Sequence, residues 1–165
     1  MKGEFMIVNM NIKKINPVPG NATLHVAELE SEGKLWGVKI HIDVIGVAML
    51  QMIQRGSSFV SPTVHHMVGD ILNILGYQVG RIVVDEPVPG MENTYRATVY
   101  IHYGGVEIHK VKVRGSDALI MACLYSLPLW FDTALCYKLP QDPGALKDFI
   151  DNAKPEEFNE NNGNK

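Results

Sequence analysis

The chain has 165 residues, 46% of them hydrophobic and 20% charged, a profile that is typical of one globular domain and excludes a disordered chain. The net charge is −3, and residues 141–165 account for it with six acids against three lysines. The remainder is neutral, which argues against tight, sequence-independent DNA binding but allows an enzyme that meets nucleic acid through a local patch.

No stretch is long and apolar enough to span a membrane, and the first residues do not resemble a signal peptide. Cys123 and Cys136 stand alone in apolar stretches, without the spacing of a zinc site or a disulfide framework. We therefore expect a cytoplasmic protein in which both thiols are buried.

The first third of the chain predicts strands at residues 4–15, 23–29 and 35–42, separated by turns at 16–21 and 30–33. Asp43 is expected to cap a helix that ends at Arg55, before Gly56. The expected apolar stripe of this helix consists of Ile45, Ala48, Met49, Met52 and Ile53.

The clearest helical pattern follows, with Ser61 as its cap, Pro62 at the first helical position and Gly76 as its stop. One side of this helix is apolar at helical spacing and should face the core, and the other side carries polar residues. The apolar side comprises Val64, Met67, Val68, Ile71, Leu72 and Leu75, and the other side His65, His66, Gly69, Asp70 and Asn73.

A strand at 78–85 and a loop at 87–90 lead to a hairpin of residues 95–103 and 106–113 around Gly104-Gly105, a two-residue turn. A third helix is expected from Asp117 to Ser126, ended by Pro128, and an extended segment at 129–139. The predicted fold class is α+β, with an antiparallel or mixed sheet and about three short helices within residues 1–140. A short helix at 145–153 and a disordered, acidic, Asn-rich tail should complete residues 141–165. The hairpin turn sets His102 opposite Glu107, Ile101 opposite Ile108 and Tyr100 opposite His109.

Three motifs, in order, carry a family resemblance. Val113-Arg114-Gly115-Ser116-Asp117 followed by an alanine-containing helix and Leu127-Pro128-Leu129 is similar to an arginine-proline-serine-aspartate motif before a proline-led strand. Upstream, Ser61-Pro62-Thr63-Val64-His65-His66 is similar to an arginine-proline and threonine-histidine-aspartate element, and Tyr95-Arg96-Ala97-Thr98 to a tyrosine-alanine-threonine strand. Over roughly residues 5–140 the chain thus resembles the bifunctional nuclease domain family.

The chain departs from the family pattern at defined positions. The motif proline is Gly115, the upstream arginine is Ser61, and the upstream aspartate is His66. Many members also open their first helix with a glycine and a glutamate-alanine pair, whereas residues 43–48 contain no glutamate. The resemblance implies an α+β domain, a homo-oligomer and hydrolysis of RNA and DNA.

Phosphodiester hydrolysis needs proton transfer and stabilisation of phosphate charge. We consider His65, His66, Asp70 and Asp117 as candidate catalytic residues, with Asp70 able to orient His66 one turn away. The candidate substrate-binding residues are Arg114, a bidentate phosphate ligand, and Ser116 at a helix start. A divalent metal, Mg²⁺ or Mn²⁺, would be the cofactor, and RNA or DNA the partner.

Purely structural roles compete with these assignments. Ser116 or Asp117 could simply cap the helix, Arg114 could pair with Asp117, and the two histidines could be solvated. Asp85-Glu86 could bind a metal or lie in a solvated turn, and the His41–Asp43 pair is compatible with a metal site.

Two functions therefore remain open: a broad nuclease, or a non-catalytic oligomeric module that binds a protein or ligand. A small-molecule regulator that uses Met49 and Met52 is a third, weaker reading, since both have core spacing.

Overall fold

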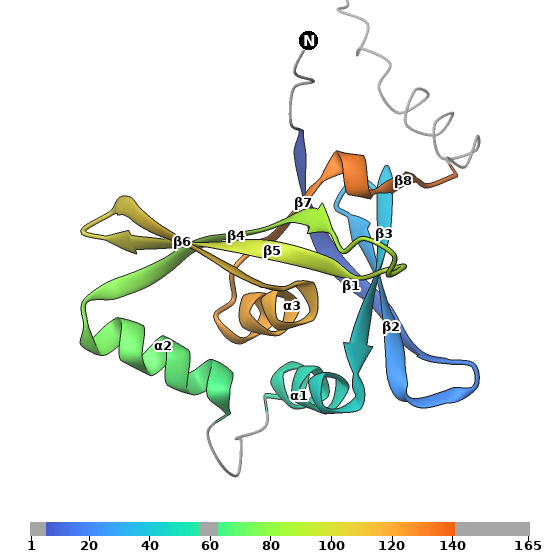
Figure 1. Cartoon of the computed structure of the whole chain (residues 1–165), viewed down its shortest axis with the longest axis horizontal. Coiled ribbons are helices and arrows are strands. Elements are labelled where there is room, and N and C mark those ends of the chain that lie inside the picture. The colour runs from blue at the N-terminus through green and yellow to red at the C-terminus, as the bar shows by residue number, and fades with distance from the viewer. Residues whose placement is uncertain (1–5, 57–62, 141–165) are drawn as a thin grey trace, which may run out of the picture.

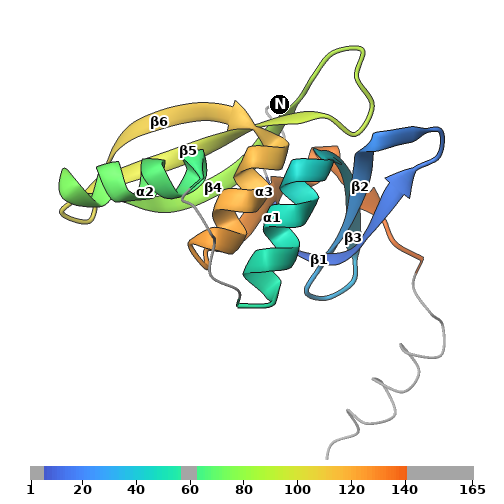
Figure 2. The same ribbon diagram turned by 90° about the horizontal axis from the view of Figure 1, so that it is seen from below.

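The computed structural model describes residues 6–56 and 63–140. These residues form one eight-stranded sheet, with three α-helices gathered on one side of it (Figures 1 and 2). The strand order is β6-β5-β4-β7-β1-β2-β3-β8, and the sheet is mixed because β4 and β7 are parallel while the other neighbours are antiparallel. The predicted α+β class is confirmed.

In chain order, the elements are β1 (Ile7–Val18), β2 (Asn21–Ser31), β3 (Trp36–Asp43), α1 (Val44–Gln54), α2 (Val64–Ile74), β4 (Tyr77–Pro87), β5 (Tyr95–Tyr103), β6 (Val106–Arg114), α3 (Gly115–Leu124), β7 (Leu129–Asp132), a 3₁₀ turn η1 (Thr133–Leu135) and β8 (Tyr137–Lys138).

The sheet consists of two halves that are turned relative to each other and meet at β7 (Figure 1). On one side of β7, Ile7 pairs with Asp132 and Met10 with Leu129; on the other, Ile82 pairs with Leu129 in parallel. Phe131, at the centre of this short strand, is fully buried. The segment at 129–139, expected to be extended, is thus a central strand followed by a 3₁₀ turn and an edge strand.

The main core lies between the sheet and the helices α1 and α3. α3 is buried along five consecutive residues from Ala118 to Ala122. The expected stripe of α1 is confirmed only in part: Met49 is buried and Ile53 packs against the core, but Ile45 is 69% exposed. The rest of the buried side consists of Gly46, Val47 and Leu50. A β-carbon at Gly46 would lie 2.7 Å from Ile42 and 3.2 Å from Ile120, so the helix packs closely through its glycine side. Because α1 is apolar on most sides, periodicity alone did not identify this face.

Other local predictions need correction. The strand β1 continues through Pro17 to Val18, so the turn is confined to the region of Gly20, whose φ is +77°. In the hairpin, His102 pairs with Glu107 as predicted, but a β-bulge then shifts the register so that Ile101 faces His109. The expected Ile101–Ile108 and Tyr100–His109 pairs are therefore wrong.

The acidic pair Asp85-Glu86 lies in β4 and not in a solvated loop. Asp85 accepts hydrogen bonds from Thr98 at 2.6 Å and from Lys112 at 2.8 Å, and Glu86 pairs with Arg96 at 3.1 Å. Both carboxylates are thus engaged by side chains of β5 and β6, which is a structural role.

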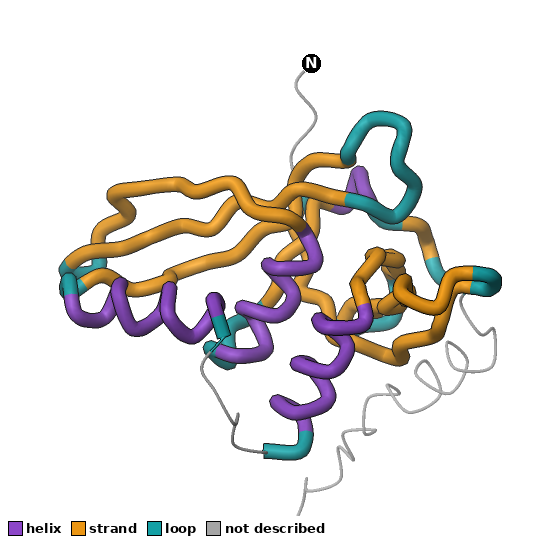
Figure 3. The backbone as a smooth tube through the Cα atoms, turned by 60° about the horizontal axis from the view of Figure 1, so that its bottom comes forward, coloured by secondary structure: helices purple, strands orange, loops and turns teal. Residues whose placement is uncertain are grey.

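The helix α2 reverses its expected orientation. It begins at Val64 with Thr63 as its N-cap, and Ser61 and Pro62 lie outside the described residues, as do the predicted helix and tail after residue 140. No residue of α2 is buried, and most of its apolar side chains are exposed, while His65 contacts Asp117 and Gly69 lies against the Tyr125 ring. Figure 3 shows α2 at the outer end of the helical layer, alongside the half of the sheet that contains β4, β5 and β6. The exposed apolar side chains of α2 and its C-cap are Val64, Met67, Val68, Ile71, Ile74 and Leu75.

No helix in the described ranges has the length and apolar character needed to cross a membrane.

Candidate functional site

The start of α3 forms the base of the candidate site. Arg114 ends β6 and is the N-cap, with extended backbone, and Gly115 is the first helical residue. The helix thus runs from Gly115 to Leu124, two residues earlier than predicted, and neither Ser116 nor Asp117 is its cap. A glycine suits the first position here, because a β-carbon would lie 2.9 Å from Ile40 Cδ1 and 3.1 Å from the Tyr95 carbonyl oxygen.

Arg114 and Asp117 form a bidentate ion pair across the first turn. The guanidinium Nε and Nη2 donate to the two carboxylate oxygens at 2.7 and 2.9 Å. The hydrogen bond to Asp117 and its charge raise the pKa of Arg114 above its usual value. The Arg114 side chain remains 72% exposed, and among the described residues its Nη1 has no partner.

The α2 residue His65 joins this pair from the opposite side. Its Nε2 lies 3.4 Å from Asp117 Oδ1, while its Nδ1 is buried without a hydrogen-bond partner. Asp117 is therefore shared between a guanidinium and an imidazole, and the Nε2 edge is the part of the ring that faces the site.

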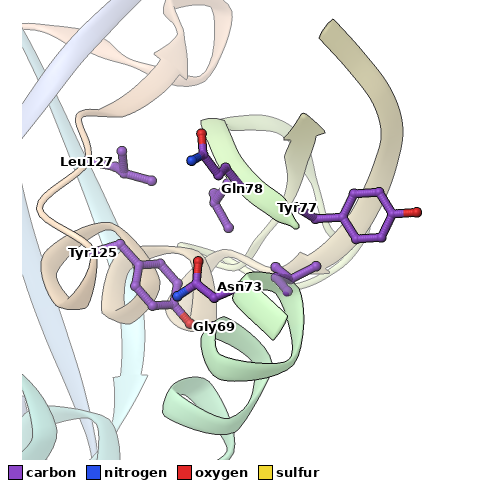
Figure 4. Close-up of a pocket in the computed structure, with 8 residues that line it drawn as sticks. Gly69, Asn73, Tyr77, Gln78, Tyr125 and Leu127 are labelled. Carbon is purple, nitrogen blue, oxygen red and sulfur yellow. The ribbon is translucent and has the colours of Figure 1, made fainter. Parts of the chain in front are cut away.

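Tyr125, just after α3, holds α2 in this position. Its hydroxyl donates to the carbonyl oxygen of His65, and its ring packs so closely on α2 that a β-carbon at Gly69 would lie 2.6 Å from the hydroxyl oxygen. Figure 4 shows this contact beside a cavity of about 250 Å³ that also carries the amides of Asn73 and Gln78. The side of α2 that carries His65, Gly69 and Leu72 is thus its packing side.

His66 and Asp70 are placed differently. His66 Nδ1 contacts the Thr63 hydroxyl at 2.8 Å and accepts from the Thr63 backbone N–H at 3.2 Å, so the ring closes a capping box at the helix start. Asp70 is exposed one turn further along. Neither residue lines the cavities around Arg114, so the structure brings together only His65, Arg114, Ser116 and Asp117 of the predicted set.

Asp43 is a component that the sequence indicated as a helix cap and, together with His41, as compatible with a metal site, but not as a neighbour of Arg114. Its Oδ1 accepts from the Gly46 N–H at 2.7 Å, as predicted, and its charge also contributes to the raised pKa of Arg114. The starts of α1 and α3 are therefore close together, which the separation of the two segments in the chain did not reveal.

Two cavities open around these residues. The smaller, about 200 Å³, is lined by His65, Asp117 and Ile45, among others, and the larger, about 430 Å³, by Tyr95 and Met91, among others. Four residues line both: Ile42, Asp43, Arg114 and Ser116.

The donor set of the site does not form a metal cage. Both oxygens of Asp117 are bound by Arg114, and one oxygen of Asp43 caps α1. Across the described residues, no group of three or more histidines, cysteines, aspartates or glutamates is arranged to hold a metal ion. We therefore derive no catalytic step through a divalent metal.

A comparison with family models matches residues 29–142 to the bifunctional nuclease domain. The match spans more than half of the chain and includes the three helices and every residue of the site described above. A comparison with curated proteins gives no match.

Proposed function

Since the chain belongs to the bifunctional nuclease domain family, we propose that it hydrolyses phosphodiester bonds of RNA, DNA or both at the site around Asp117. The observation that carries this proposal is the sharing of the Asp117 carboxylate between Arg114 and His65, at the junction of two cavities. This arrangement puts a phosphate-binding cation and a proton-transferring imidazole beside each other.

In the proposed mechanism, Arg114 Nη1 and the Ser116 hydroxyl bind oxygens of the phosphate, together with the free backbone N–H groups at the start of α3. Water attacks the phosphorus and the bond to the leaving oxygen breaks. His65 Nε2 accepts the proton of the water, and Asp117 stabilises the resulting imidazolium. The leaving oxygen takes up a proton from bulk water, and His65 then releases its own proton to solvent. No step is assigned to His66 or Asp70, whose catalytic roles stay predictions.

The site has no excess of positive charge, since Asp43 and Asp117 stand beside Arg114, and Arg96 is paired with Glu86. Substrate binding should accordingly be weak and sensitive to salt. Cleavage is thus expected to be clearest at low ionic strength.

The test is cleavage of labelled RNA and DNA by the wild type and by the Arg114→Ala and His65→Ala variants. Arg81→Ala is the matched control, because Arg81 is also exposed but lies on β4 against Tyr100. We expect kcat/KM to fall on the order of 100-fold for Arg114→Ala and for His65→Ala and to stay near wild type for Arg81→Ala. Parallel reactions with Mg²⁺, Mn²⁺ and EDTA test the predicted metal. Equal cleavage by all variants would place the activity elsewhere or in a contaminant.

The exposed apolar side of α2 favours a second role, self-association. Six apolar side chains on it are between 37% and 83% exposed, a concentration that marks interaction sites on soluble proteins. α2 contains neither lysine nor arginine, so two copies of the same face can meet without repulsion between cations, as a symmetric interface requires. We propose that α2 pairs with α2 of a second copy. We also propose that the protein works in a reducing cytoplasm, where Cys123 and Cys136 stay free.

Light scattering after size-exclusion chromatography tests this pairing. Ile74→Lys, at the most exposed position of the face, should convert an oligomer to a monomer, whereas Val106→Lys, which is similarly exposed on the hairpin, should not. A wild-type protein that is monomeric at high concentration would refute self-association. If the wild-type protein forms an oligomer but cleaves neither RNA nor DNA, the non-catalytic interaction module would be the function of the chain.

A further inference from the structure

The larger cavity beside Arg114 has a chemical character of its own. Its volume of about 430 Å³ lies within the roughly 300–1,000 Å³ of small-molecule sites. Its lining away from the shared residues is mainly apolar, and its polar groups, such as Thr94 and Arg96, are few. The apolar lining consists of Leu24, Ile40, Val88, Met91 and Tyr95.

The outer wall of this cavity is a well-anchored loop between β4 and β5. Val88 N–H donates to Thr94 O at 2.9 Å, Met91 N–H to Val88 O at 3.1 Å, and His41 N–H of β3 to Asn93 O at 2.7 Å. Met91 is nevertheless 58% exposed. An apolar side chain is thus held at a cavity mouth by a hydrogen-bonded loop, where a ligand would cover it.

The larger cavity adjoins the smaller one at Arg114 and Ser116, which line both cavities. A ligand that fills both would carry an anionic group at Arg114 and a flat, mainly apolar group with polar edges in the larger cavity. A nucleotide has this composition, with its phosphate at one end and its base at the other.

We propose that the larger cavity binds one unpaired nucleobase next to the phosphate that is cleaved, so that single-stranded nucleic acid is the substrate class; this rests on the nuclease function proposed above. A base within a duplex is stacked and paired, and it enters such a pocket only after it is extruded, with the loss of its stacking and pairing. Met91 covers one face of the base, and Tyr95 and Val88 form the wall.

The experiment compares one labelled strand, alone and annealed to its complement, with the wild type, Met91→Ser and Met6→Ser. Met6 is 50% exposed but lies just before β1, away from the larger cavity, so it controls for the loss of an exposed methionine. We expect the single strand to be preferred at least tenfold, and Met91→Ser to raise KM for it by about tenfold while Met6→Ser does not.

A strand with an abasic site at the nucleotide next to the cleaved bond separates base binding from a general effect of the loop. On that substrate the wild type and Met91→Ser should have equal KM. Equal cleavage of strand and duplex, with no effect of Met91→Ser, overturns the base pocket and leaves the nuclease intact. If the wild type cleaves neither substrate, the proposed nuclease function is refuted, and the base pocket is tested by binding alone. Calorimetry then compares the affinity for AMP with that for ribose 5-phosphate, which lacks the base. Equal affinities would refute the base pocket.

Discussion

Replacement of Gly69 by alanine should destabilise the protein, opposite to the effect expected of an exposed helix. Alanine in a helix interior stabilises by about 1 kcal/mol relative to glycine. At Gly69, however, the new β-carbon would lie 2.6 Å from Tyr125 Oη, 2.8 Å from Cε1 and 2.9 Å from Cζ. The ring must move, which costs about 1–3 kcal/mol for overpacking and weakens its hydrogen bond to His65 O, worth about 1 kcal/mol. The net expectation is a loss of about 1–3 kcal/mol.

Urea denaturation of Gly69→Ala in two backgrounds measures this sign. In the wild type the substitution should lower the unfolding midpoint, and in Tyr125→Ala, where the clash is absent, it should raise the midpoint by the helix propensity alone. Hydrogen exchange of the α2 amides locates the effect. A stabilising effect of Gly69→Ala in the wild type would refute the close packing of α2 against Tyr125.

Three further outcomes are expected. Asp43→Ala should cost about 1 kcal/mol of stability because the cap to Gly46 N–H is lost; a urea titration should find Asp43→Asn milder, and equal losses would contradict capping. Gly115→Ala should lower the thermal midpoint through its contacts with Ile40 and the Tyr95 carbonyl, at about 1–2 kcal/mol, and an unchanged midpoint would show that the wall yields freely. Burial, with a smaller contribution from Asp132, raises the pKa of the Cys136 thiol to about 12 from 9.0. The folded state therefore keeps the proton longer than the unfolded state, and stability should fall as pH rises between these values. Iodoacetamide at pH 9 should label Cys136 slowly in native protein and fast in urea, and Cys136→Ala should flatten the alkaline loss.

The sequence predicted well those features that depend on neighbouring residues. The turn at Gly104-Gly105, with positive φ at both glycines, the Asp43 cap and the Arg114–Asp117 pair one turn apart are all local. The bulge next to Ile101 was not predicted, because nothing in the alternation of that strand marks an extra residue.

Features that depend on distant partners were beyond the sequence. Periodicity shows that α2 has an apolar side, but not whether the rest of the same chain covers it, and here it does not. His66 looked as suitable as His65, yet the helix begins at Val64, which turns His66 to its own N-cap and His65 to Asp117. The proximity of Asp43 to Arg114 follows from the packing of α1 beside α3 on the sheet.

The position of β7 has a consequence for how the chain reaches this structure. The units β1-β2-β3 and β4-β5-β6 each pair strands that are neighbours in the sequence, so each can form early. They become one sheet only when residues 129–132 insert between Ile7–Met10 and Ile82–Val84, a closure over most of the chain length. Insertion of this four-residue strand should therefore be the slow step of folding, and a chain that ends before Leu129 should leave two unjoined sheets with exposed edges.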